Sequence, residues 1–433
     1  MSGRSRTTPS GRSTRRGISR SPTTDEPFRP AWRRACRVAR TGRIVNGADN
    51  IDGLAITLGV EEEFFLVDPD SRDLLADPDP AIFRTCEENR GPHKIVRELM
   101  RSQIETNTRV CRSVAELRDA LRETRRIVVE AAGRHGAAVL AASTHPFASW
   151  RAQAHTPQDR YERFTMSYQD IVRRFMVGGM HIHAGFGDVD SRIRIMTALR
   201  RYLPFLHALS GSSPFNAGRE TGFKSWRLTV VGSLPRSGLP GPLASRAEYD
   251  RLVAEYRKMK FVENGSELWW DIRPSHAYPT VELRICDICT RLEDAVTIAA
   301  LYACLIRRLM RLDREGALPP EPLTEIVAEN RWIAQRYGVL AFLGDPAREG
   351  GRIDIDDYAA ELIESVAPDA RALGCEAEVR RSVRIIREGA GADRQIDLYR
   401  LRLLEGDGEA EALRRVVDQA LAETREGIED TPG

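Results

Sequence analysis

Three consecutive glutamates, Glu61, Glu62 and Glu63, interrupt an apolar and β-favouring stretch, LAITLGVEEEFFLV at residues 54–67. Side chains alternate along a strand, so Glu61 and Glu63 share one face, with Cα atoms about 6.6 Å apart, and Glu62 lies on the other. Burying a carboxylate among Phe and Val is costly unless a cation or a hydrogen-bond donor meets it. The pattern predicts a pair of metal ligands; an edge strand whose acids face water is the alternative.

Other apolar segments also carry polar residues on one face: His181 and His183, Glu282 and Arg284, and Glu105, with Glu98 seven residues before it. Carboxylates with an occasional imidazole suit Mg²⁺ or Mn²⁺, whereas zinc would favour more His and Cys. The separation of Glu61 and Glu63 suits two ions better than one shared ion. Two hard cations beside arginines favour phosphoryl transfer from a nucleotide, because its catalysis is mainly charge stabilisation and positioning.

The elements around these residues predict an α+β fold with an antiparallel sheet. Strands interleave with helices along the chain, and the pattern from residue 322 onward is mostly helical. Ser113 and Glu116 form a capping box that opens a long helix ending near residues 133–136. A second helix is expected over residues 161–176, and the Gly/Pro/Ser-rich region 211–242 is long enough to suggest a functional loop.

Composition limits the partners and the compartment. The 433 residues carry a net charge of +2, which favours neither nucleic acid nor a membrane surface as a partner. The sequence contains no apolar run of about 18 residues, so we expect no membrane span. Seven scattered cysteines suit a reducing cytoplasm. Residues 1–53, rich in Arg and Ser, are expected to be a disordered tail or an over-extended gene start, with one catalytic domain over 54–425.

Four motifs resemble, in order and spacing, those of the type 2 glutamate–cysteine ligase family: LGVEEEFFLVD, GGMHIHAGFGD, SSPFNAGRETGFKSWR and WWDIRPS…TVELRICD. The similarity covers about residues 54–420. It implies a glutamine synthetase-like catalytic fold, also shared with guanido kinases, in which a curved antiparallel sheet forms a funnel flanked by helices. ATP and Mg²⁺, with Mn²⁺ as the alternative ion, would bind at its centre. No Walker A loop is present, so the sheet and its metals would have to hold the nucleotide.

The resemblance also implies roles for individual residues. The implied metal ligands are Glu61, Glu63, Glu105, His181 and Glu282, with Glu98 as a further candidate. Arg284 matches an arginine that faces the substrate carboxylate or the transferring phosphate. Arg227 and Arg273 are candidate partners of the phosphate or of the amino-acid carboxylate, and Lys224 is a candidate contact of the nucleotide. His183 is expected beside the ligands or facing the substrate. Asn216 stands where a large aromatic residue is expected, which leaves the shape of the substrate pocket open.

The implied reaction is ATP-dependent ligation of a carboxylate, most simply the γ-carboxylate of glutamate, to an amine such as cysteine or another amino acid. The expected partners are therefore small molecules, and a homo-oligomer is compatible with the sequence. Two alternatives stay open. A two-metal hydrolase could use the same acids and imidazoles without ATP. A non-catalytic nucleotide-binding protein could keep the site without turnover.

Overall fold

The computed structural model describes residues 53–428, which lie within one compact unit, and the predicted tail before Gly53 falls outside the described residues. A seven-stranded sheet is built around β1 (Thr57–Val67). Its other strands are β2 (Lys94–Arg97), β3 (Gln103–Asn107), β4 (Ala138–Leu140), β5 (Met180–Gly185), β10 (Ile272–Pro274) and β11 (Val281–Leu283). The order is β10-β11-β5-β1-β3-β2, β4 pairs with β1, and every pairing is antiparallel.

The two faces of β1 have different surroundings. Leu58, Val60, Phe64 and Leu66 point into the main hydrophobic core, which also contains residues of α3 (Val114–Arg134) and α10 (Leu292–Arg314). The alternation of side chains along the strand puts Glu61 and Glu63 on the opposite face. Because one face of the strand is committed to the core, its register is fixed and the two glutamates cannot exchange faces.

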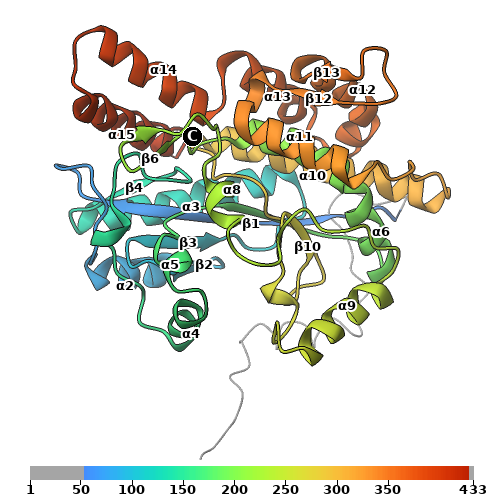
Figure 1. The fold of residues 1–433 in the computed structure, drawn as a ribbon, viewed down its shortest axis with the longest axis horizontal. Coiled ribbons are helices and arrows are strands. Elements are labelled where there is room, and N and C mark those ends of the chain that lie inside the picture. The colour runs from blue at the N-terminus through green and yellow to red at the C-terminus, as the bar shows by residue number, and fades with distance from the viewer. Residues whose placement is uncertain (1–52, 429–433) are drawn as a thin grey trace, which may run out of the picture. The chain divides into compact units, whose positions relative to one another are not determined.

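The remaining helices are α2 (Pro80–Asn89), α4 (Asp159–Tyr168), α5 (Asp170–Arg173), α6 (Val189–Leu199), α7 (Leu203–Ser210), α8 (Arg227–Val231), α9 (Arg246–Lys258), α11 (Thr324–Tyr337), α12 (Ile355–Leu373), α13 (Glu376–Glu388), α14 (Gly391–Leu404) and α15 (Glu409–Arg425). Short 3-10 helices occupy Trp150–Ala152, Arg200–Tyr202, Gly265–Glu267 and Gly338–Leu340. Helices α10 to α15 gather on one side of β1, and α4 and α9 lie on the other side (Figure 1). The predicted α+β class, with an antiparallel sheet and a mostly helical C-terminal part, is confirmed.

Three further strand pairs lie outside the main sheet: β6 (Phe215–Asn216) with β7 (Arg219–Glu220), β8 (Ser237–Gly238) with β9 (Trp269–Trp270), and β12 (Phe342–Gly344) with β13 (Arg352–Asp354). The long region 211–242 therefore contains β6, β7, α8 and β8. No helix within residues 53–428 is long and apolar enough to cross a membrane.

Local sequence signals explain two of the helix boundaries. Helix α3 begins as predicted, because the Ser113 side chain accepts a hydrogen bond from the backbone N–H of Glu116. The single helix predicted over residues 161–176 is instead two helices, α4 and α5. They are separated by Gln169, whose φ of 48° lies outside the helical region.

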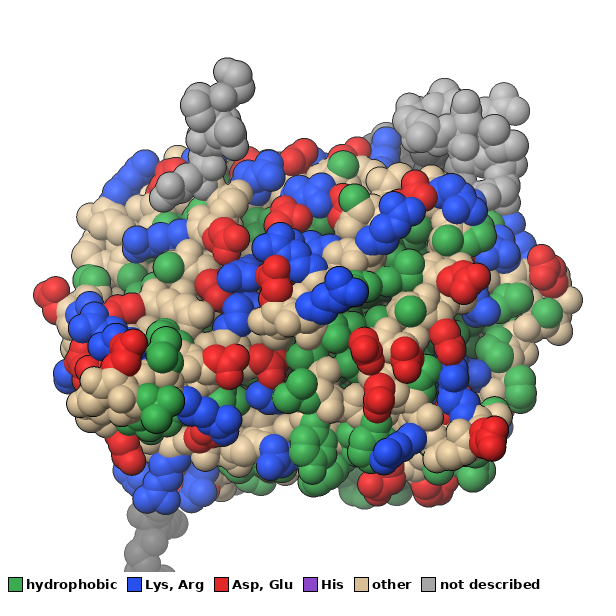
Figure 2. Space-filling view, turned by 90° about the horizontal axis from the view of Figure 1, so that it is seen from above, with side chains coloured by type: hydrophobic (Ala, Val, Ile, Leu, Met, Phe, Trp, Pro, Cys, Tyr) green, Lys and Arg blue, Asp and Glu red, His purple; other side chains and the backbone are tan. Residues whose placement is uncertain are grey.

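The surface over the C-terminal helices carries both signs of charge, interspersed (Figure 2). Opposite charges follow helical spacing on this part of the chain. Arg384 pairs with Glu388 of α13 at 2.7 Å, and Arg415 pairs with Glu411 of α15 at 2.9 Å. Such exposed pairs one helical turn apart add only a few tenths of a kcal/mol each.

Candidate functional site

Strand pairing brings the predicted ligands together on the face of β1 opposite the main core. Glu61 lies opposite His181 of β5, and Glu63 lies opposite Glu105 of β3. Glu282 reaches the same face from β11, the strand on the far side of β5. The five predicted metal ligands therefore lie on four neighbouring strands, and they divide into two clusters.

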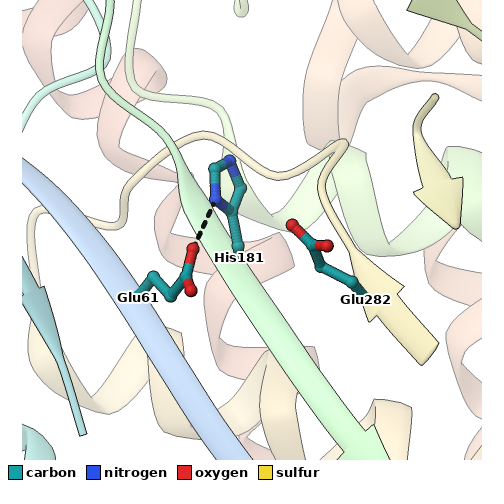
Figure 3. Close-up of side chains that lie close together, drawn as sticks. All are labelled: Glu61, His181 and Glu282. Carbon is teal, nitrogen blue, oxygen red and sulfur yellow. Dashed lines mark hydrogen bonds and ion pairs between the residues drawn. The ribbon is translucent and has the colours of Figure 1, made fainter. Parts of the chain in front are cut away.

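The first cluster consists of Glu61, His181 and Glu282, whose side chains point toward one another from β1, β5 and β11 (Figure 3). Each offers one ligand atom, and these atoms all lie within 4.8 Å of one another. His181 Nδ1 is 3.1 Å from Glu61 Oε2, and His183 Nε2 is 3.3 Å from Glu61 Oε1. Two carboxylates and one imidazole are a donor set that fits Mg²⁺ or Mn²⁺.

The second cluster consists of Glu63, Glu98 and Glu105, again with ligand atoms within 4.8 Å of one another. Burial, with repulsion from Glu98, raises the pKa of Glu63 to about 7. Burial and the neighbouring glutamates likewise raise the pKa of Glu105 well above its ordinary value. Three carboxylates held this close repel one another, and a hard cation would remove the repulsion. The cluster therefore fits a cation, and Glu98 joins the predicted ligands.

The electrostatics of the first cluster favour the protonation states that a metal requires. Burial opposes ionisation of Glu61, but its interactions with His181 and His183 outweigh it and lower the carboxyl pKa. Burial, aided by the positive charge of Arg284, lowers the pKa of His181 to about 4. At neutral pH the cluster thus combines an ionised carboxylate with a neutral imidazole, which is the form in which histidine binds metals.

Two of the predicted arginines flank Glu282. Arg273 Nε donates to Glu282 Oε2 at 2.9 Å, and Arg284 Nη1 donates to Glu282 Oε1. Arg284 Nη1 also lies 3.4 Å from His181 Nδ1. The two guanidinium groups overcome the effect of burial and hold the pKa of Glu282 well below its usual range. Positive charge is therefore concentrated at the first cluster, where it could meet a phosphate or a carboxylate.

Arg227 supports the segment directly after β11, which carries Arg284. The buried guanidinium donates to the carbonyl oxygens of Ile285 at 3.3 Å and Arg284 at 3.1 Å. It lies against Gly179, where an added Cβ would be 2.4 Å from Arg227 Nη2. Arg227 therefore fixes the position of its neighbours through their backbone.

Lys224 and Asn216 make contacts with other parts of the chain. Lys224 Nζ pairs with Asp393 of α14 at 2.7 Å. Asn216 lies in the small β6–β7 hairpin, opposite Arg219. Neither contact involves the two clusters, so the structure adds no support for a role of Lys224 at the nucleotide, and that role stays a prediction.

Two residues near the site, Asp287 and Tyr278, were not singled out by the sequence. Asp287 accepts hydrogen bonds from Ser213 Oγ and Ser225 Oγ, at 2.7 and 2.8 Å, and so ties two of the motifs together. Its position inside TVELRICD was the available signal. The Tyr278 ring lies edge-on to His183, with centroids 5.8 Å apart. Tyr278 belongs to the turn between β10 and β11, where no sequence pattern marks it.

Comparison with known proteins identifies the family of the chain. Residues 57–419 match the model of glutamate–cysteine ligase family 2. A protein of Rhodospirillum rubrum named "Putative glutamate--cysteine ligase 2" is 43% identical over 375 residues, which are 86% of this chain and 96% of that protein. A protein of the same name from Jannaschia sp. is 43% identical over 365 residues, covering 84% of this chain and 96% of its own length.

Solved structures share the fold at low identity. A glutamate–cysteine ligase from Francisella tularensis in complex with AMP superposes with a TM-score of 0.59 at 13% identity, covering 86% of this chain and 89% of that one. A bifunctional glutathione synthetase from Pasteurella multocida gives 0.61 at 15% identity, over 86% of this chain and 53% of the longer protein. The family model and the two curated relatives both span most of the chain, and the chain belongs to glutamate–cysteine ligase family 2.

Proposed function

We propose that the protein is an ATP-dependent carboxylate–amine ligase that acts on a glutamate-like carboxylate and on cysteine or another amine. The observation that carries the proposal is the division of the β1 face into two ligand clusters, with arginines at Glu282 of the first. Two cation sites beside guanidinium groups suit the transfer of a phosphoryl group from a nucleotide. Family membership and the AMP held by the similar Francisella tularensis ligase agree with this chemistry.

The reaction would proceed in two steps. An oxygen of the substrate carboxylate attacks the γ-phosphorus of ATP, and the bond between this phosphorus and the β,γ-bridging oxygen breaks. ADP departs with the bridging oxygen, and the substrate is now an acyl phosphate. The nitrogen of the amine then attacks the acyl carbon, loses a proton, and expels phosphate, which keeps one oxygen of the original carboxylate. The products are an amide, ADP and phosphate. No nucleophilic side chain is required.

The clusters supply the electrostatic part of this chemistry. Cations bound at Glu61, His181 and Glu282, and at Glu63, Glu98 and Glu105, would neutralise the phosphates; Mg²⁺ is the expected ion and Mn²⁺ the alternative. Arg284 and Arg273 would stabilise the transferring phosphoryl group or orient the substrate carboxylate. Both arginines are preorganised by Glu282, so little reorganisation is needed when the charge develops.

The same proposal covers the remaining predictions. Arg227 would act through the backbone of Arg284, and Lys224 at the nucleotide would require its ion pair with Asp393 to open. The six cysteines that the structure describes are buried free thiols, which agrees with a reducing cytoplasm. We expect small-molecule substrates and no nucleic acid or membrane partner. A homo-oligomer is compatible with the chain.

The test is the release of ADP from ATP and Mg²⁺ while the carboxylate and the amine are omitted in turn. The proposal expects ADP only when both substrates are present, and a pairwise screen of amino acids and amines would then identify them. ADP released at the same rate without an amine would overturn it. Hydrolysis of a substrate in the absence of ATP would favour the two-metal hydrolase. Nucleotide binding without any product would favour the non-catalytic alternative.

A further inference from the structure

Helices α4 and α5 form a small unit with its own apolar cluster. Of the side chains that the structure describes in these helices, Tyr161 and Val172 are buried. They pack with Leu99 and with the partly buried rings of Phe164, Tyr168 and Phe175. A unit with so few buried contacts opens at a lower free energy than the helices that cover β1. Leu99, the buried residue that these helices pack against, directly follows Glu98 of the second cluster.

Tyr161 binds that glutamate directly. Its hydroxyl donates to Glu98 Oε2 at 2.9 Å, and the backbone N–H of Leu99 donates to the same oxygen at 3.1 Å. Glu63 and Glu105 lie within paired strands, but Glu98 follows the end of β2, where the strand ladder no longer fixes the chain. These two donors therefore help to orient the carboxylate of Glu98 toward the cluster.

The other end of α4 reaches the segment that supports the first cluster. The rings of Phe164 and Tyr168 each lie 5.6 Å from the ring of Trp269, and Arg236 Nη2 donates to the Tyr168 hydroxyl at 2.8 Å. The carbonyl oxygen of Leu268, next to Trp269, accepts a hydrogen bond from Arg273 at 2.9 Å. One helix thus contacts chain segments that position a ligand or an arginine of each cluster.

We propose that Tyr161 is a positioning residue for the second cation site, and that docking of α4 against Trp269 accompanies completion of that site. The inference rests on the proposed function, because it needs a cation at Glu63, Glu98 and Glu105. With Tyr161 withdrawn, Glu98 loses the hydroxyl that donates to it at 2.9 Å, and its carboxylate is held less firmly toward Glu63 and Glu105. Cation binding would in turn fix the position of the Glu98 carboxylate and stabilise the docked position of α4, which contacts Glu98 through Tyr161.

Counting bound Mn²⁺ on the full chain by electron paramagnetic resonance tests the positioning role. The wild type should bind two ions, Glu98→Gln should lose one, and Tyr161→Phe should bind the second about tenfold more weakly, as expected for one lost hydrogen bond to a charged group. Ser167→Ala is the control on the same helix: it removes an exposed hydroxyl, leaves the rings that contact Trp269 in place, and should change the affinity by less than about twofold.

Hydrogen exchange tests the docking. Mg²⁺ should increase the protection of the amides of residues 159–173 in the wild type and have little effect in Tyr161→Phe. A wild type that binds one Mn²⁺ would overturn the second site itself. Two ions bound equally tightly by the wild type and Tyr161→Phe would overturn the role of Tyr161 alone. Protection that Mg²⁺ leaves unchanged in a wild type binding two ions would overturn the link to docking.

Discussion

Glu62 and Arg125 form a fully buried ion pair on the face of β1 opposite the two clusters. Arg125 Nε donates to Glu62 Oε2 at 3.0 Å, and neither side chain is exposed. The same guanidinium donates to the carbonyl oxygens of Thr290 and Cys289, at 3.0 and 2.9 Å. The pair ties β1 to α3 and to the segment after β11, so the three consecutive glutamates serve two different purposes.

Glu62→Gln should therefore destabilise the fold and leave the turnover of each folded molecule unchanged. It leaves the buried guanidinium without its counter-charge, and we expect the free energy of unfolding to fall by about 3 kcal/mol. Urea unfolding followed by circular dichroism measures this. The matched control is Glu130→Gln, which breaks exposed pairs with Arg126 and Arg134 on α3, the helix of Arg125, and should cost less than about 0.5 kcal/mol. Wild-type stability of Glu62→Gln, or loss of turnover per folded molecule, would contradict this assignment.

Glu61→Gln and Glu63→Gln should each remove a different cation site. Each amide loses the negative charge that its cluster needs, so each variant should bind one Mn²⁺ fewer than the wild type. We expect turnover to fall about a thousandfold in both, because the remaining ion cannot neutralise the transferring charge alone. Mn²⁺ counts combined with rates of ADP formation check this. A variant that retains both ions and the wild-type rate would show that its cluster is not a cation site.

Gly178→Ala should distort β1 at the second cluster. An added Cβ would lie 2.5 Å from the backbone oxygen of Glu63, which cannot move without breaking the sheet. Overpacking of this kind costs about 2 kcal/mol, which thermal or urea unfolding would detect. Gly133→Ala in α3 is the control, since no atom lies within 4 Å of its added Cβ, and it should be neutral or stabilise the helix by about 0.5 kcal/mol. Equal changes in the free energy of unfolding for the two variants would contradict the close approach of Gly178 to the backbone of Glu63.

The second cluster should make cation binding depend on pH. The pKa of Glu63 is raised from 4.5 to about 7, so the metal-free folded protein holds a proton that the unfolded chain releases. This contribution to stability is complete below pH 4.5 and is lost as the pH rises through 7. Because Mg²⁺ binds the ionised carboxylate, it should raise the melting temperature more at about pH 8 than at about pH 6.

Differential scanning calorimetry at both pH values measures the effect. Glu63→Gln is the control variant, because it removes the titrating carboxyl and should reduce the difference between the two conditions. The imidazoles of the first cluster remain in that variant. Their contribution to the pH dependence of the melting-temperature shift is therefore measured in Glu63→Gln and can be subtracted from the wild-type value. The same Mg²⁺ shift at both pH values in the wild type would contradict competition between protons and the cation.

The sequence predicted the parts of the site that follow from strand alternation. The period of two in VEEEF and in MHIH separated Glu61 and Glu63 from Glu62 and put His181 and His183 on one face. Alternation says nothing about residues that lie outside strands. Glu98 follows β2, and its place in the second cluster depends on the turn between β2 and β3. Glu98 is a further candidate beside the five predicted ligands through the family resemblance, and strand alternation adds nothing to that prediction.

Long-range partners could not be predicted either. Arg125 is 63 residues from Glu62. Helical spacing puts it on the apolar stripe of α3 with Leu121 and Val128, but it does not identify Glu62 as its partner. Lys224 was a candidate for the nucleotide because of its motif, yet its ion pair with Asp393 connects residues 169 positions apart. Helical periodicity also did not indicate the break at Gln169, where φ is 48°.

The oxygen balance of the reaction tests the central proposal most directly. If a carboxylate oxygen attacks the γ-phosphorus and phosphate later leaves from the acyl carbon, one carboxylate oxygen must end in phosphate. With glutamate labelled with ¹⁸O in its γ-carboxylate, ATP, Mg²⁺ and an amine identified by the screen, mass spectrometry should find one ¹⁸O in each phosphate released. Phosphate that forms together with the amide but carries no ¹⁸O would contradict an acyl phosphate and with it the proposed ligase mechanism.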